Sequence, residues 1–185
     1  MIGGRRIGVF AAMSLYGCLA AADDGLDFLA SVQREDEDYG YMAFASRVKA
    51  YVVGRRTYEV VTALCDGAFP YVGKWPIFVV MSKAADMSPQ DGITFGDLKA
   101  MASWMESQTP ATEGEEVVWC DGGGLLIAAL SAQIDEWTLS VVPALLGDGI
   151  PLFPKGRPSV DLEAVGAASY ESGLIQLSYR LATKG

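Results

Sequence analysis

The sequence predicts a single α/β domain over residues 1–185, with a mixed and mostly parallel central sheet, helices on both faces and a C-terminal antiparallel hairpin. Two observations predict this architecture. Short apolar runs alternate with segments of helical periodicity up to Asp135, as in parallel strands joined by helices. From Asp135 onward the patterns are those of strands alone, and no repeat or low-complexity linker divides the chain.

Each element follows from a local pattern. Strands are predicted where short apolar runs stop at Gly, Pro or a polar residue, in chain order at 6–12, 48–53, 76–81, 95–96 and 116–120. Helices are predicted where apolar residues recur every three or four positions, at 26–30, 36–47, 57–64, 98–107 and 125–132. Residues 109–114 form a loop, and a last set of strands is predicted at 136–142, 161–168 and 174–182, with residues 170–173 turning the hairpin.

The composition excludes several function classes. With 14 Lys and Arg against 23 Asp and Glu, the formal charge of −9 argues against a general nucleic-acid binder. The chain has no histidine, which excludes Ser-His-Asp and Cys-His catalysis and His-ligated zinc or haem. Cys18, Cys65 and Cys120 are far apart and lack CxxC spacing. They predict reduced core thiols, no metal site and a cytoplasmic protein.

The N-terminus has two interpretations. Arg5 and Arg6 precede the apolar run 7–15, and residues 15–18 resemble a lipobox, so an exported lipoprotein is one alternative. Tyr16 is bulky for that motif, and the apolar run is short. We therefore predict a buried strand here. No other apolar run approaches the roughly 20 residues of a transmembrane helix, so no membrane partner is expected.

Three junctions share one design, in which a buried strand leads through Gly or Ser, with a cation nearby, into a helix start. They are residues 53–57, 80–83 and 120–124. Ligands of parallel sheets bind beyond the carboxyl ends of the strands, and helix N-termini favour phosphate. Glycine lets the backbone approach an anion because it has no Cβ.

Together the junctions predict a bound dinucleotide or similar polyphosphate. Ser82 and Lys83 stand where a 2′-phosphate would be neutralised, which favours NADPH over NADH. The GxGxxG fingerprint is absent. Plain turns are the alternative, with Thr57 as an ordinary helix N-cap and the glycines 122–124 as a tight turn.

Four segments, spread over nearly the whole chain, carry a family resemblance: residues 14–20 (SLYGCLA), 54–59 (GRRTYE), 122–124 (GGG) and 142–153 (VPALLGDGIPLF). With them the chain resembles the dihydrofolate reductase-like superfamily. It is most similar to the C-terminal reductase domain of the bacterial bifunctional deaminase-reductases of riboflavin biosynthesis. The zinc ligands of the deaminase are missing, so we expect a stand-alone reductase domain. Tyr16 stands where the loop motif usually has Asp or Asn.

The resemblance implies NADPH-dependent reduction of a small heterocycle, either a pterin or a ribosylaminopyrimidine, in a homodimer whose contact lies near residues 145–153. Ala12 and the loop 14–20, including Gly17, would lie along the nicotinamide. The residues implied in holding the cofactor phosphates are Gly54, Arg55, Arg56, Thr57, Ser82, Lys83, Gly122, Gly123 and Gly124.

The proton that accompanies the hydride has two candidate donors. Relatives that act on folate carry a carboxylate on the helix before the Gly-Arg motif, and Asp38 lies at the comparable distance before Gly54. Asp27 is the second candidate. An acidic run at a helix start also caps the helix, so a structural role for Asp38 stays open. A non-catalytic nucleotide-binding or dimerisation module of the same fold is the alternative function.

Overall fold

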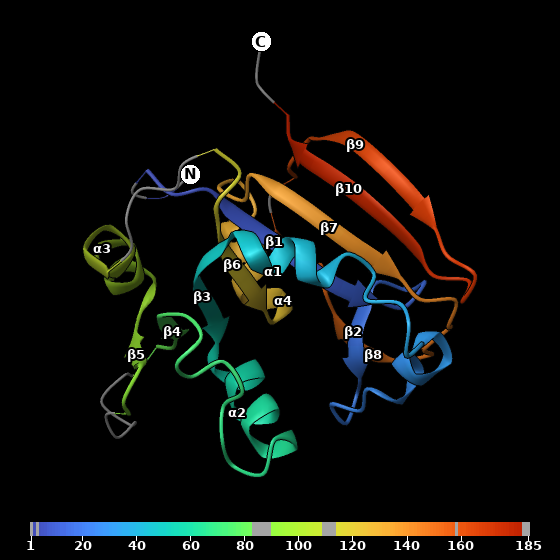
Figure 1. Cartoon of the computed structure of the whole chain (residues 1–185), viewed down its shortest axis with the longest axis horizontal. Helices are drawn as coiled ribbons and strands as arrows, with labels where there is room; N and C mark the ends of the chain where they lie inside the picture. Colours follow the sequence, from blue (N-terminus) through green and yellow to red (C-terminus); the bar gives the residue numbers. More distant parts are fainter. Residues whose placement is uncertain (1, 3, 83–89, 109–113, 158, 183–185) are drawn as a thin grey trace.

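An eight-stranded sheet forms the centre of the molecule (Figure 1). The computed structural model describes residues 2, 4–82, 90–108, 114–157 and 159–182. In sheet order the strands are β5 (Ile93–Gly96), β4 (Ile77–Val80), β3 (Val48–Gly54), β6 (Val117–Gly122), β1 (Ile7–Met13), β7 (Glu136–Val141), β10 (Ile175–Leu181) and β9 (Leu162–Ser169). Neighbours from β5 to β7 are parallel, and β10 is antiparallel to both β7 and β9. The predicted mixed sheet with its C-terminal hairpin is confirmed.

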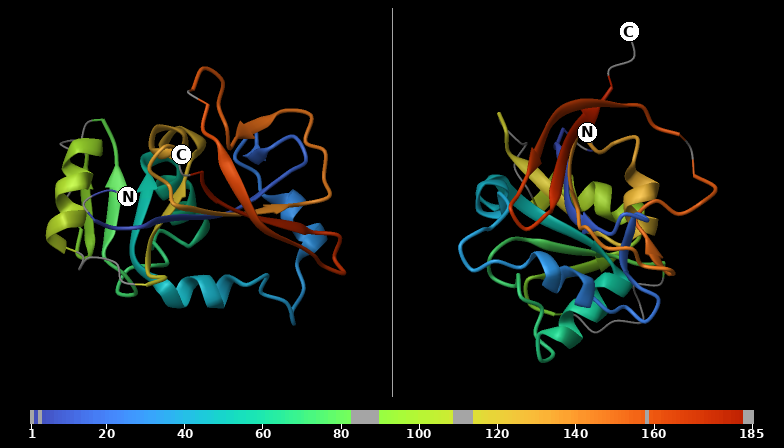
Figure 2. Two further views of the ribbon diagram at one scale, coloured as in Figure 1. Left: turned by 90° about the horizontal axis from the view of Figure 1, so that it is seen from above. Right: turned by 90° about the vertical axis from the view of Figure 1, so that its right-hand side faces the viewer.

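Helices cover both faces of the sheet, as predicted. They are η1 (Asp27–Val32), α1 (Tyr41–Arg47), α2 (Arg55–Leu64), α3 (Leu98–Gln108) and α4 (Gly124–Leu130). Phe44 of α1 and Tyr58 of α2 join one core cluster, whereas Met105 of α3 and Ile127 of α4 join the cluster on the other face. Figure 2 shows α1 and α4 on opposite sides of the sheet. Two apolar layers therefore bury the central strands on both faces.

The start of α1 differs from the prediction. The helix begins at Tyr41 rather than near residue 36. Tyr39 and Gly40 have φ angles of 54° and 78°, in the left-handed region, which a continuous right-handed helix cannot include. The acidic segment before them is a turn.

A small second sheet lies where the sequence predicted loops. It pairs β2 (Cys18–Ala21) with β8 (Gly149–Pro151) in antiparallel fashion. The strands are short and far apart in the chain, so neither carries a periodic signal of its own. Of the predicted loop 109–114, residues 109–113 lie outside the described residues.

The first apolar run forms the buried strand that the sequence predicted. β1 lies between β6 and β7, and Ile7 and Val9 are buried in the core. All three cysteines are free thiols. In the described ranges, no helix combines the length and the apolar character that crossing a bilayer requires.

Candidate functional site

The three predicted junctions lie next to one another at one edge of the sheet. β4, β3 and β6 are adjacent and parallel, so the segments that follow them leave the sheet on the same side. Gly54 is paired with Val80, and Val53 with Gly122. A Cβ on Gly54 would lie 3.0 Å from the carbonyl oxygen of Gly122. The backbones of two junctions are therefore in contact.

The N-termini of α2 and α4 meet at this contact. Gly54 and Gly123 are their N-cap residues, and neither helix has a side-chain capping hydrogen bond. The interpretation of Thr57 as N-cap is thus wrong, because Thr57 lies inside α2. Its Oγ1 is 3.2 Å from the position of a Cβ on Gly123. Two uncapped helix N-termini side by side, with bare backbone between them, fit the phosphates of a dinucleotide.

The glycines of the triplet have different reasons to be glycine. Gly122 and Gly123 have φ angles of 126° and 61°, which L side chains rarely adopt. A Cβ on Gly124 would lie 2.1 Å from the carbonyl oxygen of Pro151 in β8. Packing against the small sheet therefore requires Gly124 whether or not a ligand binds.

The arginines of the first junction already have carboxylate partners. Arg55 Nε lies 2.7 Å from Glu59 Oε1, one turn along α2. Arg56 forms a two-point pair with Asp24, in the turn after β2, and the hydrogen bonds and charge of Asp24 raise the pKa of Arg56. Both guanidinium groups are exposed. To bind a coenzyme phosphate, each guanidinium group would have to release its carboxylate partner.

The remaining predicted cofactor residues lie along the same edge, with one exception. Ser82 is exposed just beyond β4, and Lys83 lies outside the described residues. Ala12 lies near the carboxyl end of β1, paired with Ser140. The loop after β1 is closed by Ser14, whose N–H donates to the carbonyl of Cys18 at 2.9 Å. Gly17 of this loop, at φ 72°, accepts a hydrogen bond from the N–H of Leu152.

Next to the glycines, β1 and β6 separate. Their register is Ile7 with Val118 and Gly8 with Trp119, yet β1 continues to Met13 and β6 to Gly122. The pairing of β1 with β6 is therefore interrupted beside the glycine junctions, before either strand ends.

Asp121, in the part of β6 that no longer pairs with β1, is a candidate functional residue that the sequence reasoning missed. Its Oδ2 accepts a hydrogen bond from the hydroxyl of Tyr51, which is fully buried in β3. Burial raises the pKa of Asp121 to about 7, although the Tyr51 hydrogen bond acts to lower it. The sequence signal that could have identified it is an acidic residue at the end of an apolar strand. The sequence prediction assigned a role only to the glycines that follow it.

The two predicted proton donors lie at the surface. The carboxylate of Asp38 accepts hydrogen bonds from the N–H groups of Met42 and Gly40, at 2.8 and 2.9 Å, which lower its pKa. The capping alternative for Asp38 is therefore confirmed. Asp27 is exposed at the start of η1. Their roles as proton donors stay predictions.

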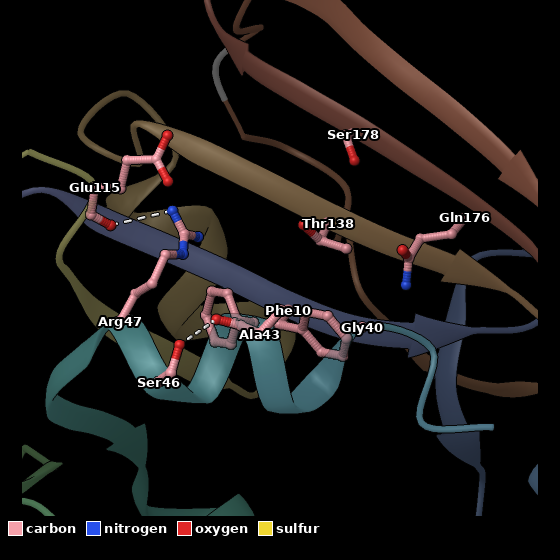
Figure 3. Close-up of a pocket in the computed structure, with 10 residues that line it drawn as sticks. Phe10, Gly40, Ala43, Ser46, Arg47, Glu115, Thr138, Gln176 and Ser178 are labelled. Carbon is pink, nitrogen blue, oxygen red and sulfur yellow. Dashed lines mark hydrogen bonds between the residues drawn. The ribbon is translucent and has the colours of Figure 1, made fainter. Parts of the chain in front are cut away.

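A separate groove of about 520 Å³ lies between α1 and strands β1, β7 and β10 (Figure 3). Phe10 and Phe44 line it with aromatic rings, and Thr138 and Ser178 contribute hydroxyl groups. Arg47 is bound there to the carbonyl of Glu115 and to Glu136. None of the residues predicted to bind the cofactor lines this groove.

Comparison with known proteins gives the family. No model of a known protein family matches the sequence. The Bacillus subtilis protein YwjB is 30% identical over 177 residues, which cover 95% of this chain and 97% of YwjB. The chain belongs to the family of YwjB. Because the match covers nearly all of both chains, the glycine junctions and the small sheet lie within the region shared with YwjB.

Solved structures show that this YwjB relative has the dihydrofolate reductase-like fold. A putative riboflavin biosynthesis protein from Shewanella sp. PV-4 matches with a TM-score of 0.79 and 27% identity, covering 96% of this chain and 99% of its own. Dihydrofolate reductase from Enterococcus faecalis, in complex with NADP(H), matches with a TM-score of 0.65 and 15% identity over 98% and 99% of the two chains. The second likeness shows the fold alone. The resemblance inferred from the motifs is confirmed.

Proposed function

We propose that this protein is an NADPH-dependent reductase that transfers hydride to a small heterocycle of the pterin or ribosylaminopyrimidine class. The observation that carries the proposal is the contact between the uncapped N-termini of α2 and α4 through Gly54 and Gly122, at the edge of the sheet. The solved relatives add support, since one was determined with NADP(H) and another is described as a riboflavin biosynthesis protein.

The chain's own residues would divide the work as follows. The backbone at Gly122 and Gly123, with the first turn of α2 up to Thr57, holds the pyrophosphate by its N–H groups. Arg55, Arg56 and Lys83 neutralise the phosphates, and the hydroxyl of Ser82 donates a hydrogen bond to them. Ala12, Gly17 and the loop between them lie along the nicotinamide, and Gly124 keeps α4 packed on β8. When bound, NADPH supplies the hydride.

The test is the effect of each coenzyme on the melting temperature. NADPH is expected to raise it well above the effect of NADH, because binding to the folded state alone stabilises by mass action. Arg55→Ala combined with Lys83→Ala should remove most of that preference. Lys49→Ala is the matched control, since Lys49 is an exposed cation paired with Glu116 at the far end of β3. No shift with either coenzyme would contradict the proposal.

Catalysis needs its own measurement. The protein is expected to catalyse the oxidation of NADPH by at least one compound in a panel of pterins and aminopyrimidines. The loss of NADPH absorbance at 340 nm measures this. NADPH binding without oxidation across the panel would favour the non-catalytic nucleotide-binding module.

The homodimer implied by the resemblance also stays a proposal. In the loop 145–153, Leu145 and Phe153 expose 70% and 52% of their surface, whereas Leu152 is buried within the chain. Exposed large apolar side chains of this kind suit a contact between copies. Sedimentation equilibrium of the wild type and of Phe153→Ser tests it, with a lower association constant expected for the variant.

A further inference from the structure

We infer that Asp121 is the catalytic proton donor of this site and that Tyr51 is the positioning residue that holds it. The inference rests on the proposed function and deepens it. It names the acid that accompanies hydride transfer and the bond that the substrate must present.

A β-bulge places Asp121. The register of β3 on β6 passes from Val52 with Cys120 to Val53 with Gly122, so Asp121 is an extra residue on β6. A bulge redirects the side chain of the extra residue and is frequent beside active sites. Here the redirected carboxylate meets the hydroxyl of Tyr51 on the neighbouring strand.

Aromatic rings surround the pair and limit its solvation. Tyr51 packs against the rings of Phe69, Tyr71, Trp75 and Trp119. Carboxylates lose hydration in such surroundings, so the neutral acid is favoured. A carboxyl group with a pKa near neutrality can donate a proton at physiological pH and then recover it.

The titratable groups near Asp121 are phenols and a thiol. Tyr51 approaches from β3 and Tyr71 from the segment before β4, whereas Cys120, next to Asp121 in β6, packs in the core on the other face of the sheet. Burial raises the pKa of each of the three, and the negative charge of Asp121 raises it further. Tyr41 of α1 also raises the pKa of Tyr71. The ammonium of Lys74 lies over the rings of Tyr41, Tyr71 and Trp75, and no ion pair joins a cation to Asp121 within the described residues.

The two carboxyl oxygens then have different roles. Tyr51 occupies Oδ2, while Oδ1 accepts no hydrogen bond from a described residue. Asp121 is also partly exposed, at the end of β6 where β1 and β6 have stopped pairing. Oδ1 is therefore the carboxyl oxygen that stays available to a ligand bound at this edge of the sheet.

The chemistry balances with a C=N bond in the substrate. Hydride adds to the carbon, and the carboxylic acid of Asp121 gives its proton to the nitrogen, which yields CH–NH, oxidised coenzyme and the Asp121 carboxylate. Solvent returns the proton to Asp121. Tyr51, whose own pKa is raised by burial, stays a phenol throughout and keeps donating to Oδ2.

The experiment compares Tyr51→Phe, Asp121→Asn and the control Tyr58→Phe. Tyr58 is also buried on this face, but its hydroxyl is bonded to Gln90. Carbon-13 NMR of protein labelled at the aspartate carboxyl carbons follows the titration of Asp121 without coenzyme or substrate. The loss of a hydrogen bond to the charged form in Tyr51→Phe is expected to move the midpoint upward by about one pH unit.

Kinetics supply the second readout. In the plot of kcat against pH, kcat is expected to fall above the apparent pKa of the donor. Tyr51→Phe should shift this apparent pKa upward by the same amount, whereas Tyr58→Phe should leave it unchanged. Asp121→Asn should lose roughly 10²- to 10⁴-fold in kcat together with that fall at high pH. Asp121→Asn keeps the shape of the side chain, so it tests the donor even if Tyr51→Phe folds poorly.

The failures can be told apart. An unmoved midpoint in folded Tyr51→Phe overturns the positioning role. Retained kcat in Asp121→Asn overturns the donor and leaves the reductase standing. If no compound in the panel oxidises NADPH, the proposed function fails and the donor role fails with it, even where the NMR midpoint moves.

Discussion

Arg56 and Asp24 join the first turn of α2 to the turn after β2 through two hydrogen bonds, from Nε to Oδ1 at 3.0 Å and from Nη2 to Oδ2 at 2.9 Å. A guanidinium group binds a phosphate with the same two-point geometry. Under the proposed function, a coenzyme phosphate would compete with Asp24 for the guanidinium group of Arg56.

Removing this competition should favour the coenzyme. Asp24→Asn is expected to tighten NADPH binding by about 1.5- to 5-fold, the range that an exposed ion pair accounts for. Titration calorimetry measures it. Glu163→Gln is the control, because Glu163 forms a two-point pair of the same geometry with Arg180 on the C-terminal hairpin. Weaker binding in Asp24→Asn would show that Asp24 organises the site rather than competing for it.

Asp121 predicts a pH dependence of stability. Its pKa in the folded protein, about 7, lies above its unfolded value. The stabilisation that follows from this difference in pKa is therefore fully present below pH 4 and is lost as the pH rises through 7. Relative to Asp121→Asn, the wild type should lose roughly 2 to 4 kcal/mol of unfolding free energy between pH 4 and 8. Urea unfolding of both proteins at several pH values measures this, and parallel curves would contradict it.

Gly124 predicts a purely structural effect. An added methyl would meet the backbone oxygens of Pro151 and Leu152 at 2.1 and 2.9 Å. Gly124→Ala is expected to destabilise the protein by about 1 to 3 kcal/mol, as overpacking does. Gly147→Ala is the control, since a Cβ there meets nothing within 4 Å, and it should leave stability nearly unchanged. Equal melting temperatures of the two variants would show that the backbone shifts to accommodate the added methyl group without loss of stability.

Asp27 and Asp38 predict only small kinetic effects. A carboxylate whose pKa is lowered by backbone N–H groups, as in Asp38, is deprotonated at neutral pH and makes a poor acid. Asp38→Asn and Asp27→Asn are each expected to lose less than about tenfold in kcat, against the roughly 10²- to 10⁴-fold that removing a general acid costs. A hundredfold loss of kcat in Asp38→Asn would show instead that Asp38 donates the proton.

Local pattern was enough to predict most of the fold. β3, β4 and β6 are buried on both faces, so they read as continuous apolar runs, and parallel topology brings their carboxyl ends to one edge. The predicted start of α1 was wrong because two residues with left-handed backbone conformation, Tyr39 and Gly40, follow the acidic segment. β2 and β8 were missed because their pairing is long-range and each strand is short.

The site was predictable only in outline. The glycines of the junctions are visible in sequence because their backbone requirements are local. The pairing of Tyr51 with Asp121 depends on a bulge between two strands whose paired residues are 68 or 69 positions apart in the chain, and no local pattern marks such a bulge. The partner of Arg56, Asp24, was likewise set by the packing of neighbouring segments, whereas the pair of Arg55 with Glu59 is local to α2.

The two-stranded sheet of β2 and β8 is attached to two helices that begin at the glycine junctions. At one end the carbonyl of Pro151 packs against Gly124 of α4. At the other end, the ion pair between Asp24 and Arg56 joins the turn after β2 to α2. The first attachment is backbone against backbone, whereas the second is an exposed ion pair that salt weakens. Ionic strength should therefore change how firmly the turn after β2 is held to α2, while the packing of Pro151 on Gly124 stays in place.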